Sequence, residues 1–523
     1  MSEKKRTIAW VISSLAVIIL LTAAIVINNS KTDSGSGKIE GTIATDNGDL
    51  KINWDRYSTT DIELSSSLTI TQSGVYHLTG SLDDGNIIIK AGSEGVVKLV
   101  LDHVSISNSN GPAIACYSAD DLVIELIGDN TLTDSASYSS DYEEDVTGAI
   151  YSKSDLTFQG EGTLNLTANY QDGIVGKDDV KFNSGIYNIT AADDGIRGKD
   201  SVYIVAGDFT INSTADAIKS TNETDVGKGF VMIESGTFAI TTSAKGIKST
   251  NSILIYGGDF AINSYDDAIH TNNYIGIVGG NITISAGDDG IHADKELIID
   301  GGNITITKSY EGLEAQAITI NDGDISIVSN DDGLNAGGGA DASAANRPGA
   351  GAFDADTSCI LSINGGEVYV NAAGDGVDSN GYLYFNGGTV VVDGPTNNGN
   401  GALDSGAGIV MNGGTVIAVG ASGMAETLGS SSTVYNASIY FSSAQSAKTK
   451  IEIKDSAGNA IIGHTSAKAF NHISVGTTDF ELGETYTIYI NGEKYQEFTI
   501  SGIVTTVGNS NTNQQMMPGG QRR

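Results

Sequence analysis

The sequence predicts an all-β protein built as a parallel β-helix, a solenoid with about 22 residues per coil, followed by a small C-terminal β domain. Three observations predict this fold: a phrase that recurs at a nearly constant spacing, short alternating apolar stretches between its copies, and a glycine-rich composition. The chain has 523 residues, of which 67 are glycine and only 4 are proline. This balance favours tight turns between short strands over helices.

The recurring phrase is DDGI or a close variant of it. Its copies are QDGIVG (171–176), DDGIRG (193–198), ADAIKS (215–220), AKGIKS (244–249), DDAIHT (266–271), DDGIHA (288–293), YEGLEA (310–315) and DDGLNA (331–336). The second residues of successive copies are 22, 22, 29, 22, 22, 22 and 21 positions apart. A spacing of this size is typical of a solenoid, because so short a unit cannot bury a core alone and must stack on its neighbours.

A second phrase runs at the same pitch between the copies of the first. It reads YGGDFAI, VGGNITI, DGGNITI and NDGDISI, and later NGGEVYV, NGGTVVV and NGGTVIAV. Each unit thus has about three short apolar stretches with period-two alternation, separated by Gly, Asn and Asp. Three strands and three corners describe one turn of a parallel β-helix. Leucine-rich repeats have a similar length, but the chain lacks their leucine framework.

The first 30 residues predict a membrane anchor. Lys4, Lys5 and Arg6 precede an apolar run from Ile8 to Ile27. A helix of this length spans roughly 30 Å, the thickness of a bilayer core. We expect an uncleaved anchor with its basic residues inside, and keep a cleaved signal peptide as the alternative. In either case the following residues face the outside, so we expect a protein that is anchored at the cell surface or secreted.

The remaining segments follow from composition and pattern. After the anchor or signal peptide (1–30), we expect a linker (31–55), the β-helix (56–430), a C-terminal β cap (431–506) and a disordered tail (507–523). Within the β-helix, the Gly/Ala-rich stretch 337–357 predicts a protruding loop. A cap is needed because an open end coil would expose unpaired strands.

Charge narrows the range of partners. The chain has 64 acidic and 28 basic residues, which gives a formal net charge of -36. Such a surface repels phosphate backbones, so we expect no nucleic-acid partner. The same field attracts cations.

The two cysteines, Cys116 and Cys359, are too far apart along the predicted stack to form a bridge. About ten coils at roughly 4.8 Å separate them, whereas a disulfide requires Cα atoms within about 7 Å. We therefore expect free buried thiols.

Acidic residues occupy the corner of the repeat in nearly every coil. Because equivalent residues of stacked coils lie about 4.8 Å apart, these acids should form a column. The expected corner column consists of Asp172, Asp193, Asp194, Asp216, Asp266, Asp267, Asp288, Asp289, Glu311, Asp331, Asp332 and Asp375. Two carboxylates at this spacing repel by roughly 1 kcal/mol in water and about 3.5 kcal/mol at an effective dielectric of 20. Calcium binds oxygens at about 2.3 to 2.6 Å and fits midway between two coils, so we predict Ca2+ along this column.

The doubled acids at 266–267 and 288–289 favour calcium most strongly, because each pair offers two carboxylates per coil. The alternative is that each Asp caps its own corner, since Asp-Gly is common turn chemistry. In one coil Lys245 takes the acidic position, where it can serve as a built-in counter-cation.

A second column should lie on the outer face of the strand that follows each corner. In GIHA, alternation directs Ile291 and Ala293 inward and leaves Gly290 and His292 outward. The equivalent positions are Val175, Arg197, Lys219, Lys248, His270, His292, Glu314, Asn335, Asp378 and Asp404. The five consecutive residues Arg197 to His292 can carry positive charge, which favours an extended anionic glycan; salt bridges to the corner column are the alternative.

Two tyrosines stand beside the corner column. Tyr265 and Tyr310 can stack on sugar rings, or can shield the edge of the core. With the five cation-capable residues, they complete the predicted carbohydrate-binding set.

Several phrases resemble a known family. SGVYHLTGSLDDGNIIIKA, VVKLVLDHVSISNSNGPAIACYSADDLVIELIGDNTLTD, GDGVDSNG and GNGALD, with the DDGI and GGNITI coils, are similar to bacterial cell-surface carbohydrate-binding β-helix proteins related in fold to pectate lyases. The resemblance spans roughly residues 55–505. It implies a right-handed parallel β-helix with bound calcium at the paired Asp corners, binding of cellulose and of acidic glycans such as polygalacturonate, and no assigned catalysis. AKGIKS departs from this pattern.

The sequence leaves three functions open. The first is a calcium-dependent module that binds polysaccharides at the cell surface. The second is a polysaccharide lyase in which Arg197, Lys219 or Lys248 abstracts a proton beside a calcium-neutralised carboxylate. Surrounding acid should raise the pKa of a lysine base, so we assign no catalytic residue. The third is a structural stalk or adhesin that calcium stiffens.

Overall fold

The computed structural model describes residues 52–337 and 355–509. All described residues belong to one compact unit. The predicted anchor, most of the linker, most of the 337–357 loop and the tail from residue 510 lie outside the described residues. Among the described residues, no helix is long and apolar enough to cross a membrane.

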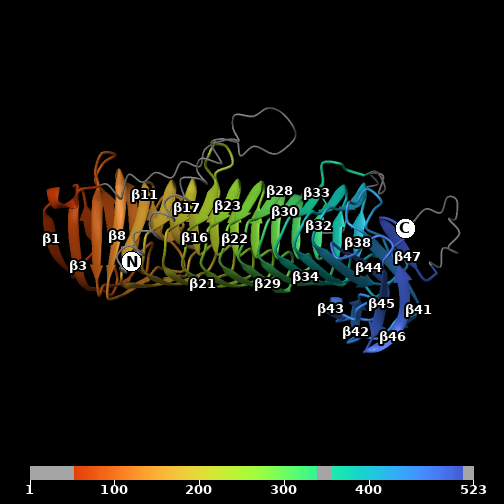
Figure 1. The fold of residues 1–523 in the computed structure, drawn as a ribbon. Coiled ribbons are helices and arrows are strands. Elements are labelled where there is room, and N and C mark those ends of the chain that lie inside the picture. Colours follow the sequence, from red (N-terminus) through yellow and green to blue (C-terminus); the bar gives the residue numbers. More distant parts are fainter. Residues whose placement is uncertain (1–51, 338–354, 510–523) are drawn as a thin grey trace, which may run out of the picture. The chain divides into compact units, whose positions relative to one another are not determined.

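The described residues form a parallel β-helix with three strands in most coils, which confirms the predicted all-β fold (Figure 1). The one helical element among them is a single 3-10 turn, η3 (Trp54–Arg56), before the first strand. We name the three stacks of parallel strands sheets 1, 2 and 3.

Sheet 1 contains the DDGI phrase. Its strands are β2 (Leu68–Ile70), β4 (Ile87–Lys90), β7 (Ile114–Ser118), β10 (Gly148–Ser152), β13 (Asp172–Gly176), β16 (Ile196–Gly198), β19 (Ile218–Ser220), β22 (Ile247–Ser249), β25 (Ile269–Thr271), the first halves of β28 (Ile291–Ile299) and β30 (Leu313–Ile320), β32 (Leu334–Ala336), β35 (Val377–Ser379) and β38 (Leu403–Ser405).

Sheet 2 follows sheet 1 in each coil. Its strands are β1 (Thr59–Leu64), β3 (Gly74–Leu82), β5 (Val97–Asp102), β8 (Asp121–Ile127), β11 (Asp155–Gly160), β14 (Asp179–Phe182), β17 (Ser201–Ile204), β20 (Phe230–Ile233), β23 (Ser252–Ile255), β26 (Tyr274–Ile277), the second halves of β28 and β30, β33 (Ile360–Ile363), β36 (Tyr382–Phe385) and β39 (Gly408–Met411).

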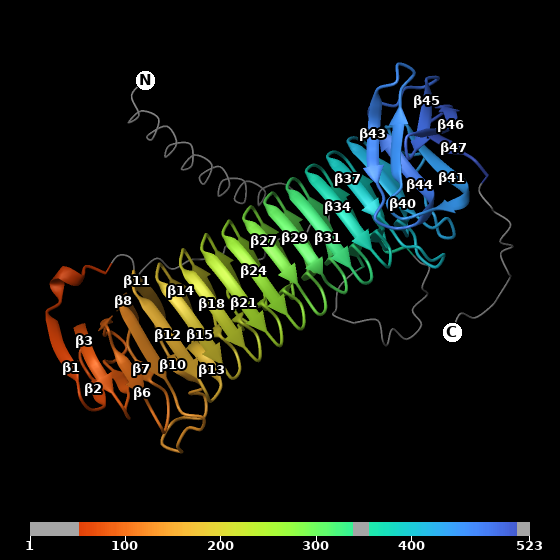
Figure 2. The same cartoon turned by 90° about the horizontal axis from the view of Figure 1, so that it is seen from below.

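Sheet 3 contains the GGNITI phrase. After the end of β3, its strands are β6 (Ser105–Ser107), β9 (Asp129–Thr133), β12 (Thr163–Ala168), β15 (Ile186–Ala191), β18 (Asp208–Ser213), β21 (Thr237–Thr242), β24 (Asp259–Ser264), β27 (Asn281–Ser285), β29 (Asn303–Lys308), β31 (Asp324–Ser329), β34 (Glu367–Ala372), β37 (Thr389–Asp393) and β40 (Thr415–Gly420). In Figure 2 these strands follow one another in chain order from β12 to β37.

The C-terminal strands close the edge of sheet 3. β44 (Phe470–Thr477) pairs antiparallel with β40 and with β41 (Asn436–Gln445), and β41 pairs in parallel with β47 (Val504–Val507). A separate antiparallel sheet follows the order β43-β42-β45-β46, with bounds Ala460–Thr465, Lys450–Lys454, Thr485–Ile490 and Glu493–Thr499. The open edge of the last coil of sheet 3 is therefore paired.

The register of the repeat is kept across the irregular 29-residue step. Ile218 pairs with Ile247 in sheet 1, and Ser201 pairs with Phe230 in sheet 2. The extra residues form a loop between β19 and β20. The inward isoleucines of successive coils therefore stack on one another and are fully buried, as at Ile269 and Ile291.

Aromatic stacks fill part of the solenoid core. Phe209, Phe238 and Phe260 occupy equivalent positions of β18, β21 and β24, and their ring centroids are 5.0 and 4.5 Å apart with nearly parallel planes. Cys116 and Cys359 are buried and no disulfide joins them, which confirms the prediction of two buried thiols.

Glycine is required where the corner before sheet 3 approaches the preceding coil. Gly280 has φ +109°, and a Cβ atom there would lie 2.9 Å from the Gly258 carbonyl oxygen. Gly302 repeats this arrangement one coil later, with φ +99° and 2.9 Å to the Gly280 carbonyl oxygen. The left-handed backbone and the close coil-to-coil contact both exclude a side chain.

Candidate functional site

The strand register aligns the two predicted columns along sheet 1. On the outer face of the strands, Arg197 pairs with Lys219, Lys219 with Lys248, and Lys248 with His270. The same column continues through the residues His292, Glu314, Asn335, Asp378 and Asp404. The corner acids precede each of these strands, so the two columns run side by side.

Each buried corner acid caps the next coil. The Oδ1 atom of Asp172 accepts a hydrogen bond of 3.2 Å from the backbone N–H of Asp194, and Asp194 accepts one of 3.0 Å from Asp216. The same bond joins Asp267 to the N–H of Asp289, and Asp289 to the N–H of Glu311, each at 3.0 Å. The alternative in which each Asp caps its own corner does not describe these positions, because the carboxylate oxygen accepts from the N–H of the following coil.

This relay continues toward the C-terminal coils. Asp332 accepts a hydrogen bond of 2.6 Å from the N–H of Asp375, and Asp375 accepts one of 2.5 Å from the N–H of Gly401. One oxygen of each relay carboxylate is thus occupied by the backbone. In Asp172, Asp194, Asp267 and Asp289, the other oxygen contacts a residue of the outer column.

The basic members of the outer column form salt bridges with the corner acids. Arg197 Nη2 lies 2.5 Å from Asp172 Oδ2, and Lys219 Nζ lies 3.1 Å from both Asp194 Oδ2 and Asp216 Oδ2. Lys248 is more loosely held, with its Nζ 3.7 Å from Asp216. These three residues therefore form the salt-bridged face that the sequence left as an alternative to a free cationic stripe.

Lys245 neutralises the doubled acid that follows it. Its Nζ atom lies 2.9 Å from Asp266 Oδ1 and 2.5 Å from Asp267 Oδ2, and the side chains of Lys245 and Asp267 are buried. Burial alone would lower the pKa of Lys245, but Asp267 and Asp266 outweigh burial and raise the pKa. A cation bound at this pair would have to compete with an ammonium group that belongs to the protein.

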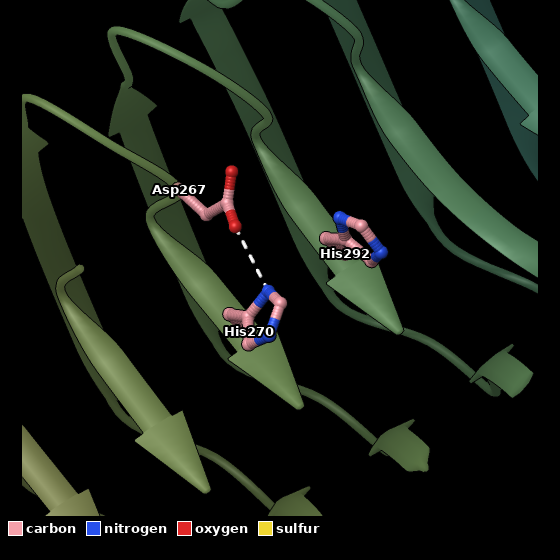
Figure 3. A group of neighbouring side chains, drawn as sticks. All are labelled: Asp267, His270 and His292. Atoms are coloured by element: carbon pink, nitrogen blue, oxygen red, sulfur yellow. Dashed lines mark hydrogen bonds and ion pairs between the residues drawn. The ribbon is translucent and has the colours of Figure 1, made fainter. Parts of the chain in front are cut away.

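The two histidines are buried, although their side chains point away from the solenoid core (Figure 3). His270 Nδ1 lies 2.9 Å from Asp267 Oδ2 and forms a hydrogen bond with it. His292 is 0% exposed, and its ring centroid is 4.9 Å from that of His270. The two side chains were predicted to face outward, but both are buried, so these positions add no exposed positive charge to the column.

His292 lies among three carboxylates at ion-pair distances. Its Nδ1 atom is 3.2 Å from Glu314 Oε2 and 3.3 Å from Asp289 Oδ2, and its Nε2 atom is 3.5 Å from Asp294 Oδ1. Neither ring nitrogen has a hydrogen-bond partner. Burial alone would lower the pKa of His292, but the surrounding acids raise it to about 11.

Acids without a basic partner gather at the C-terminal coils. Burial, followed by repulsion from neighbouring carboxylates, raises the pKa of Asp332 to about 7 and that of Asp378 to about 8. Burial also raises the pKa of Asp375 to about 6 and that of Glu426 to about 7. Within the described residues, no ion pair joins these four acids to a lysine, arginine or histidine. This group, here called the C-terminal acid cluster, is the least neutralised part of the two columns.

The two predicted tyrosines differ in their surroundings. Tyr265 is 79% exposed beside the corner column, so its ring is open to a ligand. Tyr310 is half-buried, and a hydrogen bond with Asp331 raises its pKa to about 12. Of the two, Tyr265 is better placed to stack on a sugar.

Sequence reasoning missed two features of this face. Glu426 follows the last coil and has no place in the repeat, so no periodic signal identifies it as part of the C-terminal acid cluster. The 221–229 loop adds a polar hollow of about 270 Å³ beside sheets 1 and 2, lined in part by Asn222, Lys228, Asn251 and Lys295. The irregular 29-residue step was the one sequence signal for this loop.

The fold defines the chain as a parallel β-solenoid protein. A family model described as a carbohydrate-binding domain-containing protein matches residues 65–271 and 258–346, which together exceed half of the chain. The chain therefore belongs to this family.

Two known proteins resemble parts of the chain. A carbohydrate-binding domain-containing protein of Acetivibrio thermocellus is 35% identical over 159 residues, which are 30% of this chain and 54% of the relative. The chain thus matches about half the length of that relative. The solved structure of a polysaccharide lyase-like protein from C. thermocellum, a gadolinium derivative, matches 46% of this chain and 96% of its own, with 28% identity and a TM-score of 0.39.

Proposed function

We propose that the protein binds plant cell-wall polysaccharides, both cellulose and acidic pectic glycans such as polygalacturonate, in a calcium-dependent manner at the bacterial cell surface. The observation that carries this proposal is the family membership, because the matched residues 65–346 contain most of the corner column. The name of the relative, a carbohydrate-binding domain-containing protein, supports the same class of ligand.

The charge of the sheet 1 face supports a role for calcium. Arg197, Lys219 and Lys248 are already neutralised by corner acids, so they leave little positive charge for an anionic glycan. The remaining acids would repel a uronate chain. A divalent cation held by protein carboxylates offers its open coordination positions to sugar oxygens and thereby reverses this repulsion.

The C-terminal acid cluster is the place where calcium is most favoured. Asp332, Asp375 and Asp378 come from neighbouring coils and have no basic partner among the described residues, whereas Lys245 already occupies the 266–267 pair. Ca2+ takes six to eight oxygen ligands and tolerates irregular geometry, which suits several carboxylates at a coil spacing of about 4.8 Å.

The structure gives no support to proton abstraction by the outer column. Burial lowers the pKa of Lys219, but Asp194 and Asp216 outweigh burial, so the net effect is a raised pKa. A general base must be neutral at the working pH and needs a lowered lysine pKa. Binding without cleavage is therefore the function that we favour.

Pull-down with insoluble cellulose and calcium pectate tests this proposal. We expect the full-length protein to be retained on both, and retention on pectate to fall at least about tenfold when a chelator removes Ca2+. The variant Asp375→Asn/Asp378→Asn should lose pectate retention, while Asp324→Asn, which removes an exposed acid from sheet 3, should not. Retention that is unchanged by both chelator and variant would refute calcium dependence, and absence of retention on either polymer would refute polysaccharide binding.

A further inference from the structure

His292 is a buried imidazole whose two ring nitrogens make no hydrogen bond. Buried polar groups are paired in the great majority of cases, because an unpaired group loses its water without compensation. The ring is nevertheless surrounded by oxygen atoms at 3.2 to 3.5 Å. A buried ring whose nearest partners are three carboxylates at these distances is unusual for a structural histidine, and it suits a site in which an ion lies among the same atoms.

We propose that Asp289, His292 and Glu314 form a binding site for a divalent transition-metal ion such as Zn2+ between two neighbouring coils. Asp289 lies at the corner before β28, His292 lies on the outer face of β28, and Glu314 is its register partner on β30. One ligand atom of each residue lies within 4.8 Å of those of the other two.

The distances around Nδ1 are compatible with metal coordination. The bonds of a tetrahedral Zn2+ site are about 2.0 to 2.2 Å long, so neighbouring ligand atoms lie roughly 3.3 to 3.5 Å apart. His292 Nδ1 lies 3.2 Å from Glu314 Oε2 and 3.3 Å from Asp289 Oδ2. These two edges match an ion between the three atoms, and the third edge, from Asp289 to Glu314, is at most 4.8 Å.

The carboxylate of Asp294 lies on the other side of the His292 ring. His292 Nε2 lies 3.5 Å from Asp294 Oδ1 on the side of the ring opposite to Nδ1. Metal-bound histidines usually donate their second ring N–H to a carboxylate or carbonyl group, which fixes the tautomer and orients the ring. Asp294 is placed for this positioning role.

The ligand set selects the type of ion. An imidazole with two carboxylates favours Zn2+ and similar transition metals, whereas Ca2+ prefers oxygen ligands alone. The neighbouring Asp267 and His270 are bonded to each other, and Lys245 also holds Asp267, so that pair is already satisfied. The inference is separate from calcium binding at the C-terminal acid cluster, because none of the three proposed ligands belongs to that cluster.

Metal retention in the presence of calcium tests the site. Full-length protein is stripped with EDTA, loaded with Zn2+ or Co2+ in excess Ca2+ to fill oxygen-only sites, and desalted. We expect one tightly retained Zn2+ per chain, a visible Co2+ absorption band, and an X-ray absorption spectrum of the zinc form that contains imidazole scattering. Failure to retain Zn2+, or a spectrum with oxygen ligands alone, would overturn the proposal and leave His292 as an imidazolium paired with its acids.

Variants separate the site from general charge effects. Asp294→Asn keeps all three ligands and should weaken Zn2+ binding by about 10- to 100-fold. His292→Gln and Glu314→Gln should weaken it more. Glu296→Gln, a matched change of charge in sheet 2 on the same strand β28, should leave Zn2+ affinity unchanged. Thermal melting followed by circular dichroism checks folding; equal Zn2+ affinity in folded Asp294→Asn and wild-type protein would contradict the assigned role of Asp294, and equal affinity in folded His292→Gln would overturn the site.

Discussion

Lys245 replaces an acid in the corner column, and its ammonium group neutralises the two acids that follow it. The side chains of Lys245 and Asp267 are 8% and 0% exposed, so water screens their interaction weakly. Removing one partner of such a pair leaves an uncompensated buried charge, which costs far more than the pair contributes to stability.

We predict that Lys245→Met lowers the free energy of unfolding by up to about 3 to 5 kcal/mol, because Asp267 loses its ammonium partner and keeps only the hydrogen bond with His270. Lys248→Met is the matched control. Its ammonium group is 3.7 Å from Asp216 and the side chain is 31% exposed, so a loss of about 0 to 1 kcal/mol is expected. Urea unfolding of both variants measures the difference; equal losses would contradict the role of Lys245.

The sequence predicted which residues form the two columns, but not the bonds that these residues make. Repeat spacing aligns Asp267 with Asp289, and it flags Lys245 as an exception. It does not say that one carboxylate oxygen is taken by the next backbone N–H, because that depends on corner conformation. Nor does it reveal that His292 is covered, since strand alternation gives the direction of a side chain and not what packs over it.

The corners before sheet 3 determine how closely successive coils approach. Gly280 adopts a left-handed backbone, and a Cβ atom on it would meet the carbonyl oxygen of Gly258 at 2.9 Å. The adjacent Gly279 has no such backbone, and a Cβ atom there would lie 3.2 Å from the Tyr256 carbonyl oxygen. The two glycines of one corner therefore carry different constraints.

We predict that Gly280→Ala destabilises the protein by about 1 to 3 kcal/mol, because alanine must adopt a strained backbone and displace a neighbouring coil. Gly279→Ala should cost less, since a small shift of the neighbouring carbonyl relieves its contact. The midpoints of thermal unfolding of the two variants give the comparison. A larger loss for Gly279→Ala would show that the positive φ is not the determining constraint.

Most elements could be predicted, because the spacing of the repeat determines which residues of successive coils pair. Three strands per unit and inward isoleucines at a fixed spacing define sheets 1 and 3 directly. In β28 and β30, one continuous strand belongs to both sheet 1 and sheet 2. This continuity could not be predicted, because no glycine or proline distinguishes these coils from those in which the strand is interrupted. The hollow beside the 221–229 loop also escaped prediction, since an insertion signals a loop but not its shape.

The chain has a net charge of -36, and the fold brings many of its acidic side chains close together. The stacking of coils places acids of distant sequence beside one another, and the C-terminal acid cluster lacks a basic partner among the described residues. The raised pKa values have a direct consequence for stability. A carboxyl group whose pKa is higher in the folded than in the unfolded state destabilises the fold progressively as pH rises from the unfolded to the folded pKa.

Thermal unfolding across pH 4 to 8, with and without Ca2+, tests whether the aligned acids bind divalent cations. Asp332, Asp375 and Asp378 have pKa values raised to about 7, 6 and 8, so without Ca2+ this cluster should lower the melting temperature as pH rises through that window. Calcium should raise the melting temperature of the wild type most at pH 8. Asp332→Asn/Asp375→Asn/Asp378→Asn should be more stable than wild type at pH 8 without Ca2+ and should respond less to it. A calcium response of equal size in wild type and variant, or a wild type that does not respond at any pH, would contradict the account.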